Sequence, residues 1–133
     1  MPSQDVDACP VSDDSSTPRY HYVVVRDDLP LGVLAAQLVH AAGESFSPCV
    51  SCSSDQHLRR GTYVVVLAVH DENQLLLQCA RLRAAGLEPH LIREPDAPYN
   101  GQAMALAVPP TQDRATVRRV LANLPLLKEK TLV

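Results

Sequence analysis

Short apolar runs alternate along this chain with longer stretches in which apolar residues recur at helical spacing. Residues 20–26 (YHYVVVR) and 61–70 (GTYVVVLAVH) are β-branched runs, typical of buried strands. Residues 89–94 (PHLIRE) and 102–110 (QAMALAVPP) predict two further strands. The Pro-rich PDAPYNG between them predicts a turn, and so a hairpin.

Two of the intervening stretches predict helices. Residues 31–45 (LGVLAAQLVHAAGES) are apolar or small with few charges, and we expect this helix to end near Gly43. Residues 72–86 (ENQLLLQCARLRAAG) predict the second helix, whose one face carries the apolar positions Leu75, Leu76, Cys79, Leu82 and, just beyond it, Leu87. Asp71 is the expected N-cap of this second helix, and Gly86 is expected to close it.

A last helix is expected over residues 112–124 (QDRATVRRVLANL), capped by Thr111 and followed by the short tail LPLLKEK. Residues 45–60 are polar without periodicity and predict a long loop. The resulting order is β-α-β-α-β-β-α. Strands joined by helices pair in parallel, so we predict one α/β domain with a mixed four-stranded sheet flanked by helices.

The size of the chain fits this prediction. It has 133 residues, 46% of them hydrophobic, which is enough to close one core without disulfides or metal. No apolar run approaches the roughly 18 residues of a membrane span. The acidic N-terminus does not resemble a signal peptide, so we expect a cytoplasmic protein without membrane contact.

Charge is distributed unevenly along the chain. The net charge is −3, but residues 1–18 hold four aspartates and no Lys or Arg. Residues 19–133 therefore carry 12 positive and 11 negative charges, a balance that permits a basic face. We expect residues 1–18 to be a disordered acidic tail and residues 19–133 to form the domain.

The four cysteines do not define a metal site. Cys49 and Cys52 form a CxxC, but no second ligand pair follows to complete a closed zinc site. A redox CxxC belongs at a strand-to-helix junction, whereas this one lies in a Ser-rich stretch. Unpaired loop thiols are favoured, with Cys79 expected in the core and Cys9 in the tail. No metal site is expected from these cysteines.

One stripe of the first helix is polar. Gln37, His40 and Glu44 follow one another at helical spacing, with Val33 one turn before. A polar stripe on an otherwise apolar helix is either a satisfied core network or the wall of a site.

Several of these motifs resemble a known family. YVVVRDDLPLGVLAAQLVHA is similar to the opening of the type II peptidyl-tRNA hydrolases, a strand ending in Arg-x-Asp-Leu followed by Gly-x-x-Ala-Ala-Gln-x-x-His-Ala. The second strand and helix resemble the middle of that family, and AMALAVPP with LPLLK resembles its close. The likeness runs from Tyr20 to Lys128 and is nearest to the divergent peptidyl-tRNA hydrolase domain-containing branch.

The resemblance implies a four-stranded mixed sheet and hydrolysis of the ester joining a peptide to tRNA, without a cofactor. It also exposes departures. The family places a lysine where this chain has Val33, an aspartate where it has Glu94, and a threonine at or near Met104. The shorter PDAPYNG also lacks the family's Thr-Gln.

The residues that remain could still carry ester hydrolysis. His40 is the expected general base, Glu94 could orient it or act as base itself, and Gln37 could donate to the oxyanion. Buried His and Gln residues are otherwise ordinary core groups. Arg26 and Asp28 end the first strand, where ligands meet α/β sheets, although a turn-stabilising pair is the simpler interpretation.

The tRNA would be bound by arginines. The candidates are Arg59 and Arg60 in the long loop, and Arg114 and Arg118, which share a face of the last helix. No aromatic residue interleaves with them in the sequence, so stacking of bases is not indicated. An ordinary solvated helix face is the alternative interpretation.

Two functions from different classes therefore remain. The first is a hydrolase acting on peptidyl-tRNA or a related acyl-tRNA. The second is a catalytically inactive module of the same fold that binds tRNA, a protein or a small ligand. A homodimer is compatible with either.

Overall fold

The computed structural model describes residues 19–46, 62–111 and 114–128. The elements follow in the order β1 (Arg19–Arg26), α1 (Leu31–Phe46), β2 (Thr62–Val69), α3 (Glu72–Ala84), β3 (His90–Glu94), β4 (Gln102–Thr111) and α4 (Arg114–Val120). This confirms the predicted α/β fold class and the predicted order of elements.

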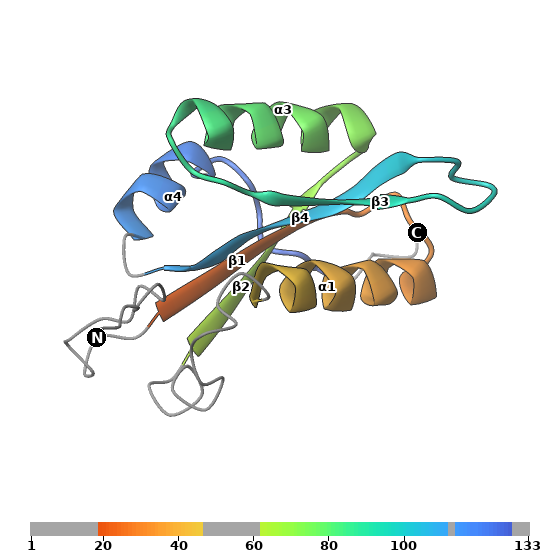
Figure 1. Ribbon diagram of the computed structural model, residues 1–133, viewed down its shortest axis with the longest axis horizontal. Helices are drawn as coiled ribbons and strands as arrows, with labels where there is room; N and C mark the ends of the chain where they lie inside the picture. The colour runs from red at the N-terminus through yellow and green to blue at the C-terminus, as the bar shows by residue number, and fades with distance from the viewer. Residues whose placement is uncertain (1–18, 47–61, 112–113, 129–133) are drawn as a thin grey trace, which may run out of the picture.

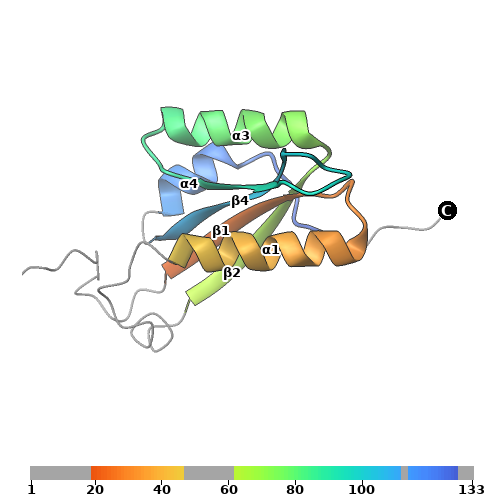
Figure 2. The same cartoon turned by 45° about the vertical axis from the view of Figure 1, so that its right-hand side comes forward.

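The four strands form one mixed sheet in the order β2-β1-β4-β3. β1 pairs with β2 in parallel and with β4 antiparallel, and β3 and β4 form the predicted hairpin. Helix α1 covers one face of the sheet, and α3 and α4 cover the other (Figures 1 and 2). The strand β1 is therefore buried on both faces, which explains its continuous valine run.

The core has two halves, one on each face of the sheet. Val24 faces α3 and α4, whereas its neighbours Val23 and Val25 face α1. In β4 the small side chains of Ala105 and Ala107 belong to the α1 half and are fully buried. A helix can pack closely on such small residues, and this places α1 directly over the centre of the sheet.

Helix boundaries follow the sequence signals at some ends and not at others. Asp71 is the N-cap of α3, where its side chain accepts a hydrogen bond from the backbone N–H of Gln74 at 2.9 Å. Gly86 follows the helix with a φ of +86°, as a closing glycine does. Helix α1 instead continues through Gly43 and ends at Phe46. A glycine can also adopt the helical conformation, so Gly43 by itself does not end the helix.

Thr111 ends strand β4, where it is paired with Tyr20 of β1. Its expected role as a helix cap stays a prediction, because residues 112 and 113 lie outside the described residues. The described part of α4 is shorter than predicted and ends at Val120. The chain then turns so that its next residues can reach β2. There the N–H of Ala68 donates to the carbonyl of Pro125, and Leu127 donates back to Val66, each at 2.9 Å.

Several sequence-based expectations lie outside the described residues. These are the acidic tail, most of the long loop, Arg59, Arg60, and the cysteines Cys9, Cys49 and Cys52. Cys79 is buried in the core, as predicted. Within the described ranges, every helix is too short or too polar to cross a membrane.

A histidine lies in the core beneath the end of α1. His21 of β1 is fully buried and hydrogen-bonds through Nε2 to the Ser45 hydroxyl. That hydroxyl donates its single proton to the Ala42 carbonyl at 3.0 Å, so the His21 N–H is assigned as the donor. Burial, with a smaller contribution from His90, lowers the pKa of His21 from 6.5 to about 4.

This pKa predicts a loss of stability in acid. The unfolded chain takes up a proton at His21 near pH 6.5, whereas the folded protein does so only near pH 4. The free energy of unfolding should therefore fall across this window by up to roughly 3 kcal/mol. Urea unfolding between these pH values should show a shallower decline for His21→Gln than for the wild type. Parallel pH profiles would contradict the prediction.

Candidate active site

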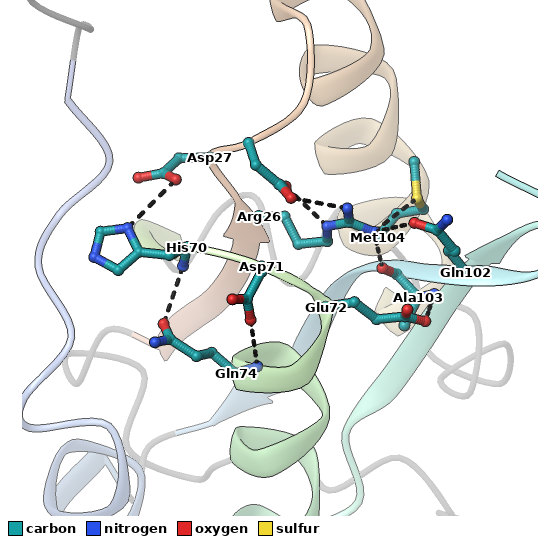
Figure 3. A network of polar contacts seen from close by, with 10 residues as sticks. Arg26, Asp27, His70, Asp71, Glu72, Gln74, Gln102, Ala103 and Met104 are labelled. Carbon is teal, nitrogen blue, oxygen red and sulfur yellow. Dashed lines mark hydrogen bonds and ion pairs between the residues drawn. The ribbon is translucent and has the colours of Figure 1, made fainter. Parts of the chain in front are cut away.

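The side chain of Arg26 ties together three segments at the carboxyl end of β1. Its Nε and Nη2 donate to the two carboxylate oxygens of Asp28, each at 2.9 Å. Its Nη1 donates to Gln102 Oε1 at 2.9 Å and to the Ala103 carbonyl at 3.0 Å, both at the start of β4 (Figure 3). The bonds to Asp28 raise the pKa of Arg26 above its ordinary value, so this buried guanidinium stays charged.

A second polar contact joins α1 to the end of β3. The Gln37 side chain is 3% exposed, and its Nε2 donates to Glu94 Oε1 at 3.1 Å. The other carboxylate oxygen of Glu94 accepts the N–H of Asp96 at 3.2 Å. The following turn returns to Gly101, which has a φ of +93° and donates its N–H to the Glu94 carbonyl at 2.7 Å. The carboxylate is therefore held from the helix and from its own turn.

These two networks are neighbours, because Glu94 and Gln102 are partners in the β3–β4 ladder. From the other side, Glu72 at the start of α3 accepts the N–H of Ala103 at 2.8 Å. Asp27 and His70, which follow β1 and β2, lie beside this network, with 3.7 Å between Asp27 Oδ1 and His70 Nδ1 (Figure 3). Polar groups from both faces of the sheet thus converge at one edge, which is where ligands meet sheets of this type.

Gln37 is committed to this contact. Only its NH₂ group can donate to a carboxylate, so the contact fixes the direction of the amide. Its Oε1 is then buried without a hydrogen-bond partner among the described residues. An unpaired buried acceptor costs about 1–3 kcal/mol of stability. The Gln37–Glu94 contact is therefore kept at a cost, which good packing by itself does not explain.

The predicted polar stripe separates in the structure. Gln37 faces inward and meets Glu94, whereas His40 and Glu44 are exposed. Among the described residues, the His40 ring makes no hydrogen bond to Glu94 or to any other side chain. The structure therefore brings together two of the three predicted catalytic residues and leaves the third on the open side of α1.

The predicted RNA-binding arginines have surroundings that the sequence did not indicate. The Arg114 guanidinium lies 3.9 Å from the centre of the Tyr20 ring. Tyr20 in turn stacks on Tyr63, with ring centres 5.4 Å apart. No aromatic residue interleaves with these arginines in the sequence, and this stack forms only in space, because Tyr20 and Tyr63 come from β1 and β2, far from Arg114 in sequence. Arg118 is exposed on α4.

Sequence reasoning also missed Gln102 and Glu72. The positions of these residues, at the first residue of a strand and of a helix, are the only signal that could have suggested them. No group of three His, Cys, Asp or Glu side chains in the described part of the chain is placed to bind a metal ion.

The chain matches one known family over most of its length. Residues 20–127 match the family Peptidyl-tRNA hydrolase PTH2, which is more than half of the chain. The protein therefore belongs to this family of translation-related hydrolases. A search against individual curated proteins found no match.

The positions that depart from the expected family pattern are packed differently from one another. Val33 is half-buried and packs against the α1 half of the core. Met104 is fully buried, with its sulfur 3.9 Å from Arg26 Nη1. Glu94 alone is both partly accessible and held by donors. The carboxylate is thus the one departing position that still offers reactive chemistry.

The Gln37–Glu94 contact predicts a charge-dependent double-mutant result. Gln37→Glu places two carboxylates side by side and should lower the free energy of unfolding at neutral pH by about 1–3 kcal/mol. The repulsion raises the pKa of one carboxyl, so the loss should shrink as the pH falls toward 4. The exchange Gln37→Glu/Glu94→Gln should recover most of the stability at pH 7. An exchange variant no more stable than Gln37→Glu alone would contradict the contact.

The Arg26 network predicts that a positive charge at this position does not by itself maintain the stability of the fold. Arg26→Lys keeps the positive charge but cannot form the planar fork to Asp28 and also reach β4. We expect a loss of about 2 kcal/mol in chemical denaturation. Arg83→Lys, at an exposed arginine of α3, is the matched control and should stay within about 0.5 kcal/mol. Equal losses in the two variants would show that the fork has no special role.

Proposed function

We propose that the chain hydrolyses the ester between the acyl group and the terminal ribose of peptidyl-tRNA or a related acyl-tRNA, with Glu94 as general base. The observation that supports this most directly is the Glu94 carboxylate, held by Gln37 at the sheet edge in a chain that belongs to the PTH2 family. Action in the cytoplasm and on tRNA follows from the same proposal. Homodimerisation stays a prediction.

The chemistry requires one water and no cofactor. Glu94 takes a proton from the water as its oxygen attacks the ester carbonyl carbon. The tetrahedral intermediate then collapses, and the bond to the ribose oxygen breaks. The proton passes to that oxygen, which leaves as the tRNA hydroxyl, and the acyl group departs as a carboxylic acid that ionises at neutral pH. Glu94 returns to its starting state.

Gln37 has a positioning role in this proposal. Its amide points one carboxylate oxygen in a fixed direction, which lowers the entropy lost when water and ester meet. Arg26 acts one step further away, because it fixes Gln102, the ladder partner of Glu94. His40 is exposed and close in sequence to Gln37, so it is available to contact the ribose or phosphate of the incoming RNA end.

The inactive binding module remains the second candidate, and a specific observation favours it. Val33 stands where the resemblance expects a lysine, and it packs against the core. Met104 is similarly buried. If those positions supplied indispensable groups, the fold would persist here without the reaction.

Single-turnover hydrolysis of a labelled N-acylated aminoacyl-tRNA distinguishes the hydrolase from the inactive binding module. Glu94→Gln should slow the wild-type reaction by about 100-fold or more, equivalent to roughly 2.7 kcal/mol of transition-state stabilisation. Glu88→Gln, at an exposed glutamate before β3, is the matched control and should retain the wild-type rate. His40→Ala tests whether the exposed histidine contributes to the reaction, and Val39→Ala, at its exposed neighbour, is the variant with which its rate is compared.

Cleavage by the wild type with equal rates in Glu94→Gln and Glu88→Gln would keep the hydrolase but remove the proposed base. Absence of cleavage above buffer, in protein shown to be folded, would leave the binding module.

A further inference from the structure

A concave surface lies on the face of the sheet opposite α1. It encloses about 600 Å³ between α4, strands β1 and β2, and the C-terminal segment. Tyr22 and Leu67 contribute to its apolar floor, and Leu126 to its outer wall. None of the described residues that line it is an aspartate or glutamate. The described lining of the groove is therefore apolar at its base and contains no carboxylate.

Three positive charges surround this groove. Arg114, Arg118 and Arg119 all line it, and they are three of the seven residues of α4. Within the described ranges none of them forms an ion pair, and the Nε of Arg114 is buried without a hydrogen-bond partner. Since arginines next to one another repel, this arrangement favours binding of an anion with more than one charge.

Aromatic rings accompany these charges. Arg114 stacks on Tyr20, and Tyr20 stacks on Tyr63, whose side chain is 58% exposed. A tyrosine stacked on one side and open on the other offers a flat surface for a further ring. Arginines beside an open aromatic face are the combination that proteins use for unpaired nucleotides.

We propose that α4 and the Tyr20–Tyr63 stack form an RNA-binding face that holds part of the tRNA remote from its acylated end. The arginines would contact phosphates, and Tyr63 would stack against a base. The inference rests on the proposed function for the identity of the RNA, but not for the binding itself.

RNA fits this face better than an acidic peptide does. A peptide supplies carboxylates and apolar side chains, which would account for the arginines and the groove. It would leave the exposed Tyr63 stack unused. RNA provides closely spaced charges together with rings that stack, and so accounts for both observations.

The face also lies away from the hydrolytic site. Its Tyr20–Tyr63 stack is near the beginning of β1, on the opposite face from Gln37, whereas Arg26 ends the same eight-residue strand. At about 3.3 Å per residue the two ends of β1 are roughly 20 Å apart. The acyl group and this face therefore contact different parts of one RNA.

Binding of deacylated tRNA tests the proposal without depending on hydrolysis. Fluorescence anisotropy would compare the wild-type full chain with Arg118→Ala/Arg119→Ala between about 50 and 200 mM salt. We expect the double variant to bind about tenfold more weakly and the salt slope to fall by roughly two. Tyr63→Ala should weaken binding about tenfold with little change in slope.

The matched control is Arg81→Ala/Arg83→Ala, which removes the same charge from the exposed side of α3. It should bind within about twofold of the wild type. A second arm of the experiment uses a short RNA that carries only the tRNA 3′ end. The two double variants should bind this short RNA with the same affinity. Thermal unfolding would confirm that all variants are folded.

Equal losses in the two double variants would overturn the proposal, because the effect would then be net charge alone. An α4-dependent loss for the short RNA would overturn the assignment to the remote part of tRNA. Binding of an acidic peptide but not of RNA would replace RNA with a protein partner. If RNA binding depends on α4 but no hydrolysis is found, the inference stands and the proposed reaction fails.

Discussion

The buried guanidinium of Arg26 is the interaction on which the arrangement of the sheet edge depends. It connects the parallel pair β1–β2 to the hairpin β3–β4 through Gln102 and Ala103, and it fixes the turn after β1 through Asp28. A buried charge is tolerated only when its donors are satisfied, so these segments must meet in one geometry. The position of Glu94 follows, because it pairs with Gln102 in the ladder. The candidate site is thus built on a structural ion pair.

The fold was predictable from the chain because its strands and helices have distinct hydrophobic periods. The valine run of β1, the Asp71 cap and the Pro-rich turn each specify their element locally. The C-terminal strap, residues 125–127 bonded to β2, was not predictable, since a strand bridge such as Leu67–Leu126 depends on where two distant segments meet.

The candidate site was predicted in part. Helical spacing identified Gln37, and the resemblance identified Glu94, but only the structure shows that they are in contact. Spacing could not tell that His40, three residues later, falls on the open side of the helix. The Arg114–Tyr20–Tyr63 stack was missed because it joins three elements. Local patterns specify which face a residue occupies more readily than which residues meet across elements.

The C-terminal strap has a consequence for the solubility of the chain. β2 is an edge strand with the uncharged sequence TYVVVLAV, and such an edge offers unpaired backbone groups to any second strand. Pro125 and Leu127 form hydrogen bonds with the backbone groups of Ala68 and Val66, so the C-terminal half of this edge strand is already paired. The strap thereby protects an uncharged, β-branched edge strand, so a damaged C-terminus would favour strand-to-strand association even where the core still folds.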